Sequence, residues 1–247
     1  MIKTAFIKDI NPDLPQTWQD KVFLTIDIDW AHEQIIEETL EIIHKYKINA
    51  TLFVTNKSNA LFKWCNSNYI DYGIHPNFKP LLLSKELNKY NMEEEIYKLM
   101  KICPNAKAVR AHARIHGSPF ENIYKDIGLT HESNFFIPSY SNIELKPYKL
   151  WNNLISVPYG WEDDTIFFKE KEFSNFSDPV NYIQKVKSGL LVLDFHPIHI
   201  FLNTESTKRY ENTREIHKKP DELIKYRYKG YGTRNRFIDT LKLISGK

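Results

Sequence analysis

The sequence predicts a single-domain α/β protein, a complete or incomplete (β/α) barrel rather than a doubly wound sheet. Residues 22–55 read as a strand, a helix and a second strand, and this order forces the two strands to pair in parallel. The alternation of apolar strands and amphipathic helices then continues along the chain. No linker rich in Pro, Gly and Ser interrupts it, and 247 residues are enough for one large core.

The first unit of this alternation is the clearest. Its first strand begins with Val22-Phe23-Leu24, an apolar run typical of a strand buried in a parallel sheet. The helix that follows, residues 32–47, carries an apolar stripe that includes Ile36 and Leu40. Its acids come early and its lysines late, as the helix dipole prefers. Residues 49–55 form the second buried strand.

The later elements repeat the pattern. Further strands are expected at 69–74, 108–110, 129–133, 154–157 and 190–195. Further helices are expected at 92–102, from about 118, where Pro119 suits the first turn, and at 237–244. The prediction is therefore seven strands in one domain that spans residues 1–247.

Composition excludes several classes of protein. There are only 8 glycines and neither a G-x-G-x-x-G nor a Walker-type loop, so a nucleotide-driven machine is not expected. Cys65 and Cys103 are far apart and form no C-x-x-C pair, which fits a reducing compartment. The start of the chain has no recognisable secretory signal, and no stretch approaches 18 apolar residues. We therefore expect a soluble, cytoplasmic protein.

The net charge of +3 hides a strongly basic segment. Residues 207–236 hold ten Lys and Arg against four acids, a balance of +6, with four tyrosines interleaved. The first interpretation is a solvated surface excursion at about 203–234. The second is a surface that binds an anionic or sugar-containing substrate. A nucleic acid is not expected as the partner.

Two aspartates stand at the end of the first strand. Because strand side chains alternate between faces, Asp27 and Asp29 point the same way. Two adjacent carboxylates repel each other unless a cation or a shared proton relieves them. The pair therefore indicates a metal-binding carboxylate beside a catalytic base. The alternative is a pair of solvated loop aspartates.

Ionisable residues follow nearly every predicted strand. In barrels of this kind, catalytic residues collect at the carboxyl ends of the strands. Those ends read Asp27-Ile28-Asp29, His75-Pro76-Asn77, Arg110-Ala111-His112, His131-Glu132-Ser133, Trp161-Glu162-Asp163-Asp164 and His196-Pro197-Ile198-His199. Ionisable residues at the ends of so many apolar strands indicate one active site at that edge of the sheet.

These strand ends resemble the motifs of the polysaccharide deacetylase (NodB-homology) family of carbohydrate esterases, and within it a branch associated with O-antigen gene clusters. The resemblance extends from about Val22 to His199 and leaves the basic segment outside. It rests on five motifs, at 25–30, 73–78, 109–112, 158–164 and 193–199. The family implies a distorted seven-stranded (β/α) barrel and the metal-dependent removal of N-acetyl groups from sugars.

The resemblance implies a role for each matching position. Asp27 matches the base that activates water, while Asp29 and His75 match metal ligands. Arg110 matches the arginine that orients the catalytic aspartate, and His196 matches the histidine that protonates the leaving amine. The implied cofactor is a divalent metal, with zinc expected, which lowers the pKa of bound water and polarises the carbonyl.

The sequence departs from the family pattern in two places. Lys79 stands where a second histidine ligand is usual, and a charged lysine cannot bind a metal. His112 is the expected third ligand, with Asn77 and His131 as alternatives. Ile28 separates two acids that are usually adjacent, but the spacing keeps both carboxylates on one strand face.

Other residues at the strand ends are expected to contact the substrate. Trp161, Glu162 and Asp163 are expected to form a sugar platform, in which a ring stacks on the indole and the carboxylates accept hydrogen bonds from hydroxyls. The alternative for these three is a packed indole with solvated acids. Asn77 and His199 complete the set, although His199 could instead support a neighbouring residue.

The expected function is a metal-dependent N-deacetylase that acts on an N-acetylated sugar during surface-polysaccharide assembly. We expect a nucleotide- or lipid-linked intermediate, whose phosphates the basic segment would hold through residues such as Arg227 and Lys229. That segment could instead rest against an anionic membrane face. Two alternatives remain open: a metal-dependent hydrolase of another amide or formamide on the same scaffold, and a non-catalytic carbohydrate-binding relative without metal.

Overall fold

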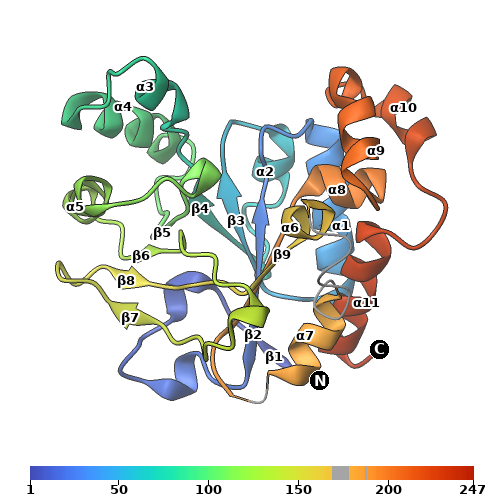
Figure 1. The fold of residues 1–247 in the computed structure, drawn as a ribbon, viewed down its shortest axis with the longest axis horizontal. Coiled ribbons are helices and arrows are strands. Elements are labelled where there is room, and N and C mark those ends of the chain that lie inside the picture. The colour runs from blue at the N-terminus through green and yellow to red at the C-terminus, as the bar shows by residue number, and fades with distance from the viewer. Residues whose placement is uncertain (169–177, 187) are drawn as a thin grey trace.

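The computed structural model describes residues 1–168, 178–186 and 188–247, and it is built around one curled sheet (Figure 1). The strand order is β7-β8-β6-β5-β4-β3-β2-β10-β9, and β1 pairs with β2 outside this path. All these pairs are parallel except β7 with β8. The sheet therefore forms a half-barrel, and the prediction of an α/β domain with a distorted, incomplete barrel is confirmed.

The ten described strands are mostly short. They are β1 (Lys3–Thr4), β2 (Lys21–Asp27), β3 (Ala50–Val54), β4 (Ile70–Ile74), β5 (Ala108–Val109), β6 (His131–Glu132), β7 (Tyr148–Lys149), β8 (Ile155–Ser156), β9 (Trp161–Glu162) and β10 (Leu191–Phe195). The seven predicted strands correspond to β2, β3, β4, β5, β6, β8 and β10, and the structure adds β1, β7 and β9, which have two residues each and lie outside the apolar runs on which the prediction rests.

Helices cover the convex side of the sheet and the carboxyl ends of its strands. The α-helices among the described residues are α1 (Glu33–Tyr46), α2 (Asn59–Lys63), α3 (Lys79–Leu83), α4 (Lys89–Met100), α5 (Ser118–Ile127), α6 (Asp163–Phe168), α7 (Pro179–Lys185), α8 (Pro197–Leu202), α9 (Thr207–Asn212), α10 (Pro220–Leu223) and α11 (Thr233–Ser245). No helix in the described part of the chain is long and apolar enough to cross a membrane.

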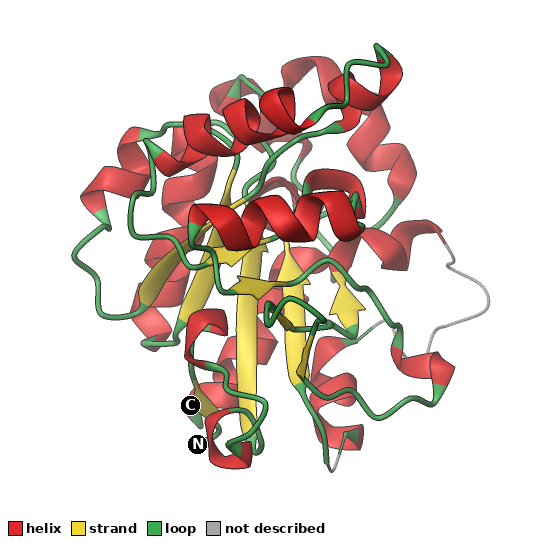
Figure 2. Cartoon of the chain, turned by 90° about the vertical axis from the view of Figure 1, so that its left-hand side faces the viewer, coloured by secondary structure: helices red, strands yellow, loops and turns green. Residues whose placement is uncertain are grey.

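Two helix starts differ from the prediction for local reasons. The helix expected at 92–102 begins at Lys89, because the side chain of Asn88 accepts a hydrogen bond from the Asn91 backbone and caps that turn. The last helix begins at Thr233, before its apolar stripe, and packs against α7 and α8. Both chain ends lie together away from the strand tips (Figure 2), and the Ile2 backbone donates to the Ile244 carbonyl.

Strand alternation sorts the side chains of β2 between two cores. Val22, Leu24 and Ile26 point outward into the large cluster under the helices. Phe23 points into the concave face, where a second cluster includes Phe53 and Tyr159. An amino-terminal segment closes this inner cluster with Ile7, Ile10 and Trp18. The inward positions further along β2 are Thr25 and Asp27, so the sheet directs polar groups towards its carboxyl end.

The basic segment is folded against the rest of the protein. It comprises α9, the 3₁₀-helix η5 (Arg214–Ile216), α10 and a second 3₁₀-helix, η6 (Ile224–Tyr226). In Figure 1 these elements lie beside α8 and α1. Glu38 on α1 accepts ion pairs from both Arg227 and Arg234. Part of the positive charge therefore holds the segment in place.

Gly73 on β4 gives a test of packing on the concave face. A Cβ added there would lie 2.8 Å from the Ala108 carbonyl oxygen and 2.8 Å from the Phe53 ring. Because both neighbours are fixed, we expect Gly73→Ala to lower the free energy of unfolding by about 1–3 kcal/mol. Urea denaturation measures this change, and an unchanged midpoint would show that the sheet relaxes around the methyl group.

Candidate active site

The predicted site residues gather at the carboxyl end of the sheet. Asp27 ends β2 and Asp29 follows it, His75 follows β4, and His196 follows β10. Arg110 and His112 lie in the loop after β5. Parallel strands bring these loops to one edge, as the sequence predicted.

The centre of the site is a buried arginine. Arg110 is 1% exposed, and its Nη1 donates to Asp27 Oδ1 at 2.9 Å and to Thr25 Oγ1 at 3.0 Å. Its other nitrogens donate to the carbonyl and the hydroxyl of Ser133, both at 2.9 Å. The guanidinium also lies between the rings of Phe53 and Tyr159, 4.5 and 4.2 Å from their centroids. Its direction and charge are therefore fixed.

A second carboxylate on this arginine was missed by the sequence reasoning. Asp194 lies in the middle of β10, is 1% exposed, and accepts hydrogen bonds from Arg110 Nη1 and Thr25 Oγ1. Burial raises the pKa of Asp194 well above its usual value, although the guanidinium opposes the shift. An acid inside the apolar run of residues 190–195 was the available signal.

Asp29, His75 and His112 form one group. Asp29 Oδ1 lies 3.2 Å from His75 Nε2 and 3.3 Å from His112 Nδ1, and the three atoms are all within 4.8 Å of one another. The backbone at Asp29 and Trp30 is left-handed, with φ of 40° and 54°, which turns the chain sharply after β2. This turn brings the Asp29 carboxylate towards loops from two other strands.

The donor set of this group suits a divalent metal ion. One carboxylate oxygen and two imidazole nitrogens are common zinc ligands, and three protein ligands leave a position for water or substrate. With both histidines neutral, three lone-pair donors would converge on one point, an arrangement that a cation or a proton must relieve. The residues present therefore fit the implied metal.

Without a metal, protons on the histidines relieve the repulsion among these three side chains. Burial raises the pKa of Asp29, but hydrogen bonds from His112 and His75 outweigh this effect and hold the pKa well below its usual value. Burial lowers the pKa of His75, while the charges of Asp27 and Asp29 more than compensate and raise it. Metal binding at this group would therefore displace protons.

His196 is oriented by an aspartate from the neighbouring strand end. Asp163 Oδ1 accepts from His196 Nδ1 at 2.7 Å, and Asp163 Oδ2 accepts from the His196 backbone at 2.9 Å. His196 Nε2 is thereby left facing the site, 3.7 Å from Asp29 Oδ2. Burial lowers the pKa of His196, but the charges of Asp164 and Asp163 outweigh burial and raise it well above its usual value. The raised pKa favours the protonated form of the ring.

A further carboxylate, Asp164, flanks the same imidazole. Its Oδ2 lies 3.9 Å from His196 Nε2, and its Oδ1 lies 2.6 Å from His199 Nε2. His199 is buried and its Nδ1 contacts Thr204 Oγ1 at 3.1 Å. His199 thus fixes the Asp164 side chain, which the sequence reasoning had not included among the site residues.

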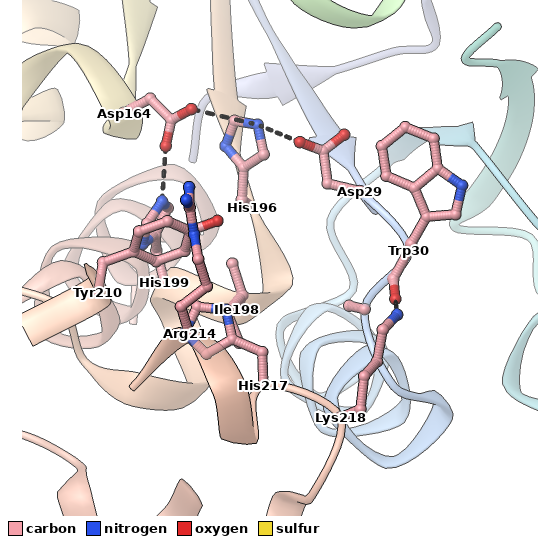
Figure 3. A pocket seen from close by; sticks show the side chains of 11 residues that line it. Asp29, Trp30, Asp164, His196, Ile198, His199, Tyr210, Arg214, His217 and Lys218 are labelled. Carbon is pink, nitrogen blue, oxygen red and sulfur yellow. Dashed lines mark hydrogen bonds and ion pairs between the residues drawn. The ribbon is translucent and has the colours of Figure 1, made fainter. Parts of the chain in front are cut away.

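Of these residues, Asp29, Asp164, His196 and His199 border an open cavity of about 240 Å³ (Figure 3). Figure 3 shows His196 between Asp164 and Asp29, with Tyr210, Arg214 and Lys218 of the basic segment along another part of the wall. Pockets that enclose whole drug-sized ligands measure about 300–1,000 Å³. This cavity therefore suits one small group of a larger substrate.

The expected sugar platform is not formed as predicted. Trp161 is 3% exposed and packs on Phe195, 4.6 Å between ring centroids, so the packed-indole alternative describes it. The reason is strand alternation, because Trp161 on β9 is level with the outward-facing Leu193. Glu162 faces inward beside Asp194, is 8% exposed, and accepts from Arg114 at 2.9 Å.

The two alternative metal ligands lie in other surroundings. The Asn77 side chain accepts a hydrogen bond from the Lys79 backbone and shapes the turn before α3. His131 is buried on β6, where its Nε2 contacts the Ile10 carbonyl at 2.8 Å. Neither belongs to the group around Asp29, and Asn77 stays a predicted substrate contact without a direct test.

Comparison with known proteins identifies the family. Residues 24–214 match the model of the WbmS-like family, described as polysaccharide deacetylase. The chain belongs to this family. The resemblance predicted from the strand-end motifs is therefore confirmed, and the matched region also includes the first part of the basic segment.

Solved structures agree with this assignment. WbmS from Bordetella bronchiseptica, described as a polysaccharide deacetylase involved in O-antigen biosynthesis, is 33% identical, with a TM-score of 0.90 and 98% of each chain covered. A polysaccharide deacetylase from Mycobacterium smegmatis is 14% identical, with a TM-score of 0.51 over 71% of this chain and 77% of its own, and shows the fold alone. A search of curated proteins found no match to this chain.

Glu162 gives a pH-dependent test of the site. Burial raises its pKa from 4.5 to about 7, although Arg114 opposes the shift. Between these two pH values the unfolded chain releases a proton that the folded chain retains, so stability falls as pH rises through this window. We expect Glu162→Gln to remove up to about 3 kcal/mol of this pH-dependent change.

Urea denaturation at several pH values between 4 and 8 measures the effect. Glu222→Gln, at an exposed ion pair with Lys219, is the matched control and should follow the wild type. Parallel pH profiles for Glu162→Gln and the wild type would show that Glu162 ionises freely in the folded protein.

Proposed function

We propose that this protein is a metal-dependent N-deacetylase that hydrolyses the acetamide of an acetylated sugar. The observation that carries the proposal is the position of Asp27, which Arg110 holds beside the group of Asp29, His75 and His112. Family membership supports a deacetylase. The geometry supports the proposal because the candidate base, the candidate metal group and the candidate proton donor lie close together.

Asp29, His75 and His112 would hold the metal, and zinc is our proposal for its identity. When bound, such an ion supplies an acidic water and polarises the acetyl carbonyl. Every remaining role falls to side chains of this chain. The three ligands come from the ends of β2, β4 and β5, so the sheet itself fixes their separation.

Asp27 is the proposed general base. Arg110 binds its Oδ1, and this leaves Oδ2 turned towards the metal group, 3.6 Å from His75 Nε2. A water placed at the metal group would therefore lie near Asp27 Oδ2, the carboxylate oxygen that Arg110 does not bind. Asp27 would accept the proton of that water as its oxygen attacks the acetyl carbon.

His196 is the proposed general acid. Asp163 binds its Nδ1, so the proton on Nε2 points into the cavity. Breaking the amide requires a proton on the leaving nitrogen, since an amide anion is a very poor leaving group. His196 would donate that proton, and Asp163 would stabilise the charged ring before transfer.

The substrate is proposed to be a precursor of a surface polysaccharide. WbmS, which aligns over nearly the whole chain, is described as involved in O-antigen biosynthesis, and this supports the same role here. We propose a cytoplasmic, nucleotide- or lipid-linked intermediate. Cys65 and Cys103 are both free thiols, which fits a reducing compartment.

Metal content tests the ligand group directly. We expect purified wild-type protein to bind about one zinc ion per chain, and His75→Ala and His112→Ala each to lose most of it, because three ligands hold the ion. Elemental analysis after dialysis measures this. His44→Ala is the control, since His44 lies on α1 and packs against Trp64, away from the metal group, so this substitution should not alter metal content. Full occupancy in His112→Ala would remove His112 from the group.

Acetate release tests the chemistry. In a panel of N-acetylated hexosamines, free and phosphate-linked, we expect one substrate class to be turned over with release of acetate. Asp27→Asn should lower kcat by about 10²- to 10⁴-fold while metal is retained, because only the base is lost. Asp178→Asn, at the N-cap of α7, is the matched control. Turnover by Asp27→Asn at the wild-type rate would contradict the assigned base.

A further inference from the structure

The basic segment contributes one wall of the active-site cavity. Tyr210 on α9, Arg214 on η5, and His217 and Lys218 just after η5 line the same cavity as Asp29 and His196. In Figure 3 the Arg214 side chain extends towards Asp164 and His199, while Lys218 lies on the opposite side, below Trp30. Two cations from one short stretch thus reach the space beside the metal group.

Other cations of the segment are used for structure. Arg209 pairs with Glu205, and its guanidinium also donates to the Tyr226 carbonyl at 2.8 Å. Arg227, which the sequence suggested as a phosphate contact, binds both carboxylate oxygens of Glu38 at 3.0 Å. The cations that line the cavity are therefore different residues from those that hold the segment on α1.

Lys218 carries its charge without a carboxylate partner. Its Nζ donates to the Trp30 carbonyl, and within the described parts of the chain no acid lies within ion-pair distance of it. Partial burial lowers the pKa of Lys218, since part of its hydration is lost. An anion beside the ammonium group would stabilise its charge and so compensate for the lost hydration.

Among the described residues, Arg214 makes only one weak ion pair. Its Nη2 lies 3.3 Å from Glu211, three residues earlier, and both side chains are mostly exposed. Exposed pairs of this kind contribute little to stability, so an anionic ligand can replace Glu211 as the partner of Arg214. The planar guanidinium offers several N–H groups that match the oxygens of a phosphate or a carboxylate.

The wall formed by the basic segment differs from the catalytic end of the cavity in its charge. At the catalytic end, Asp29 and Asp164 lie on either side of His196, and the proposed metal and the charged imidazole would offset these two carboxylates. The described residues that the basic segment contributes to the cavity include no acid. If the acetamide lies at the metal group, an anionic group elsewhere on the substrate therefore finds cationic partners along the wall of the basic segment.

We infer that Arg214 and Lys218, at separate points of this wall, make it an anion-binding subsite of the active site, and that the substrate carries a phosphate or carboxylate group in addition to its acetamido sugar. This inference rests on the proposed function, because it takes the acetamide to lie at the metal group. The subsite gives the enzyme its choice of substrate class. A neutral N-acetyl sugar would fill the catalytic end of the cavity and leave both cations without a partner.

Binding to an Asp27→Asn protein tests the subsite without turnover. We would measure by calorimetry the Kd of N-acetylglucosamine, its 1-phosphate, the corresponding N-acetylated uronic acid, and inorganic pyrophosphate. At least one anionic compound should bind about tenfold or more tightly than the neutral sugar, and this advantage should weaken with salt. The 1-phosphate and the uronic acid distinguish the two sources of charge.

Two substitutions then locate the subsite. Arg214→Gln and Lys218→Gln, each in the Asp27→Asn background, should reduce the affinity for the anionic compound at least fivefold and leave the neutral sugar unchanged. Lys219→Gln is the matched control, because its ion pair with Glu222 lies outside the cavity. Urea denaturation checks whether loss of the Lys218 contact with Trp30 disturbs the fold, and Arg214→Gln tests the subsite without touching that contact.

The outcomes separate this inference from the proposed function. Anion binding that requires Arg214 and Lys218, in a protein that releases no acetate from any substrate, would support the subsite and contradict the deacetylase. Acetate release with equal affinity for charged and neutral sugars would support the deacetylase and contradict the subsite. The inference is also overturned if none of the anions binds, or if both substitutions weaken charged and neutral sugars alike.

Discussion

The site depends on one buried cation, the guanidinium of Arg110. Removing a charged group from water costs several kcal/mol, so it is stable only where partners replace the water. Here the partners come from the carboxyl ends of several strands: Asp27 of β2, Asp194 of β10, and Ser133 after β6. Satisfying this one side chain therefore fixes where three strand ends meet, and with them Asp27, the proposed general base.

The single positive charge of Arg110 does not balance the carboxylates that surround it. Arg110 faces both Asp27 and Asp194, and burial raises the pKa of Asp194 although the guanidinium opposes the shift. Asp29, next to them, is stabilised by protons on two imidazoles. A divalent cation at Asp29 would replace those protons and stabilise the folded state by mass action. Metal binding and the stability of this edge of the sheet are thus linked.

Much of this arrangement could be predicted from the sequence, because parallel strands bring their carboxyl ends to one edge of the sheet. The direction of the Asp29 carboxylate could not, because a left-handed turn at Asp29 and Trp30 sets it, and not strand alternation. Asp27 and Asp29 follow one apolar strand, and Arg110 follows the third strand after it in the chain, so these residues predict convergence whatever the details of the loops. Asp194 was missed because its partner is 84 residues away, and only the tertiary structure shows why an acid is buried there. Trp161 was placed wrongly because β9 is too short for its register to be read from the sequence.

The basic segment shows why composition alone could not assign its role. Its excess of lysine and arginine is real, but the structure divides these residues between two tasks. Glu38 on α1 binds Arg227 and Arg234 and anchors the segment, and η5 is thereby held beside the cavity with Arg214 and Lys218 directed into it. Loss of Arg227 and Arg234 would release the segment from α1, and loss of Arg214 and Lys218 would remove the cations from the cavity wall. The anchoring cations are therefore as necessary for substrate choice as the two that face the substrate.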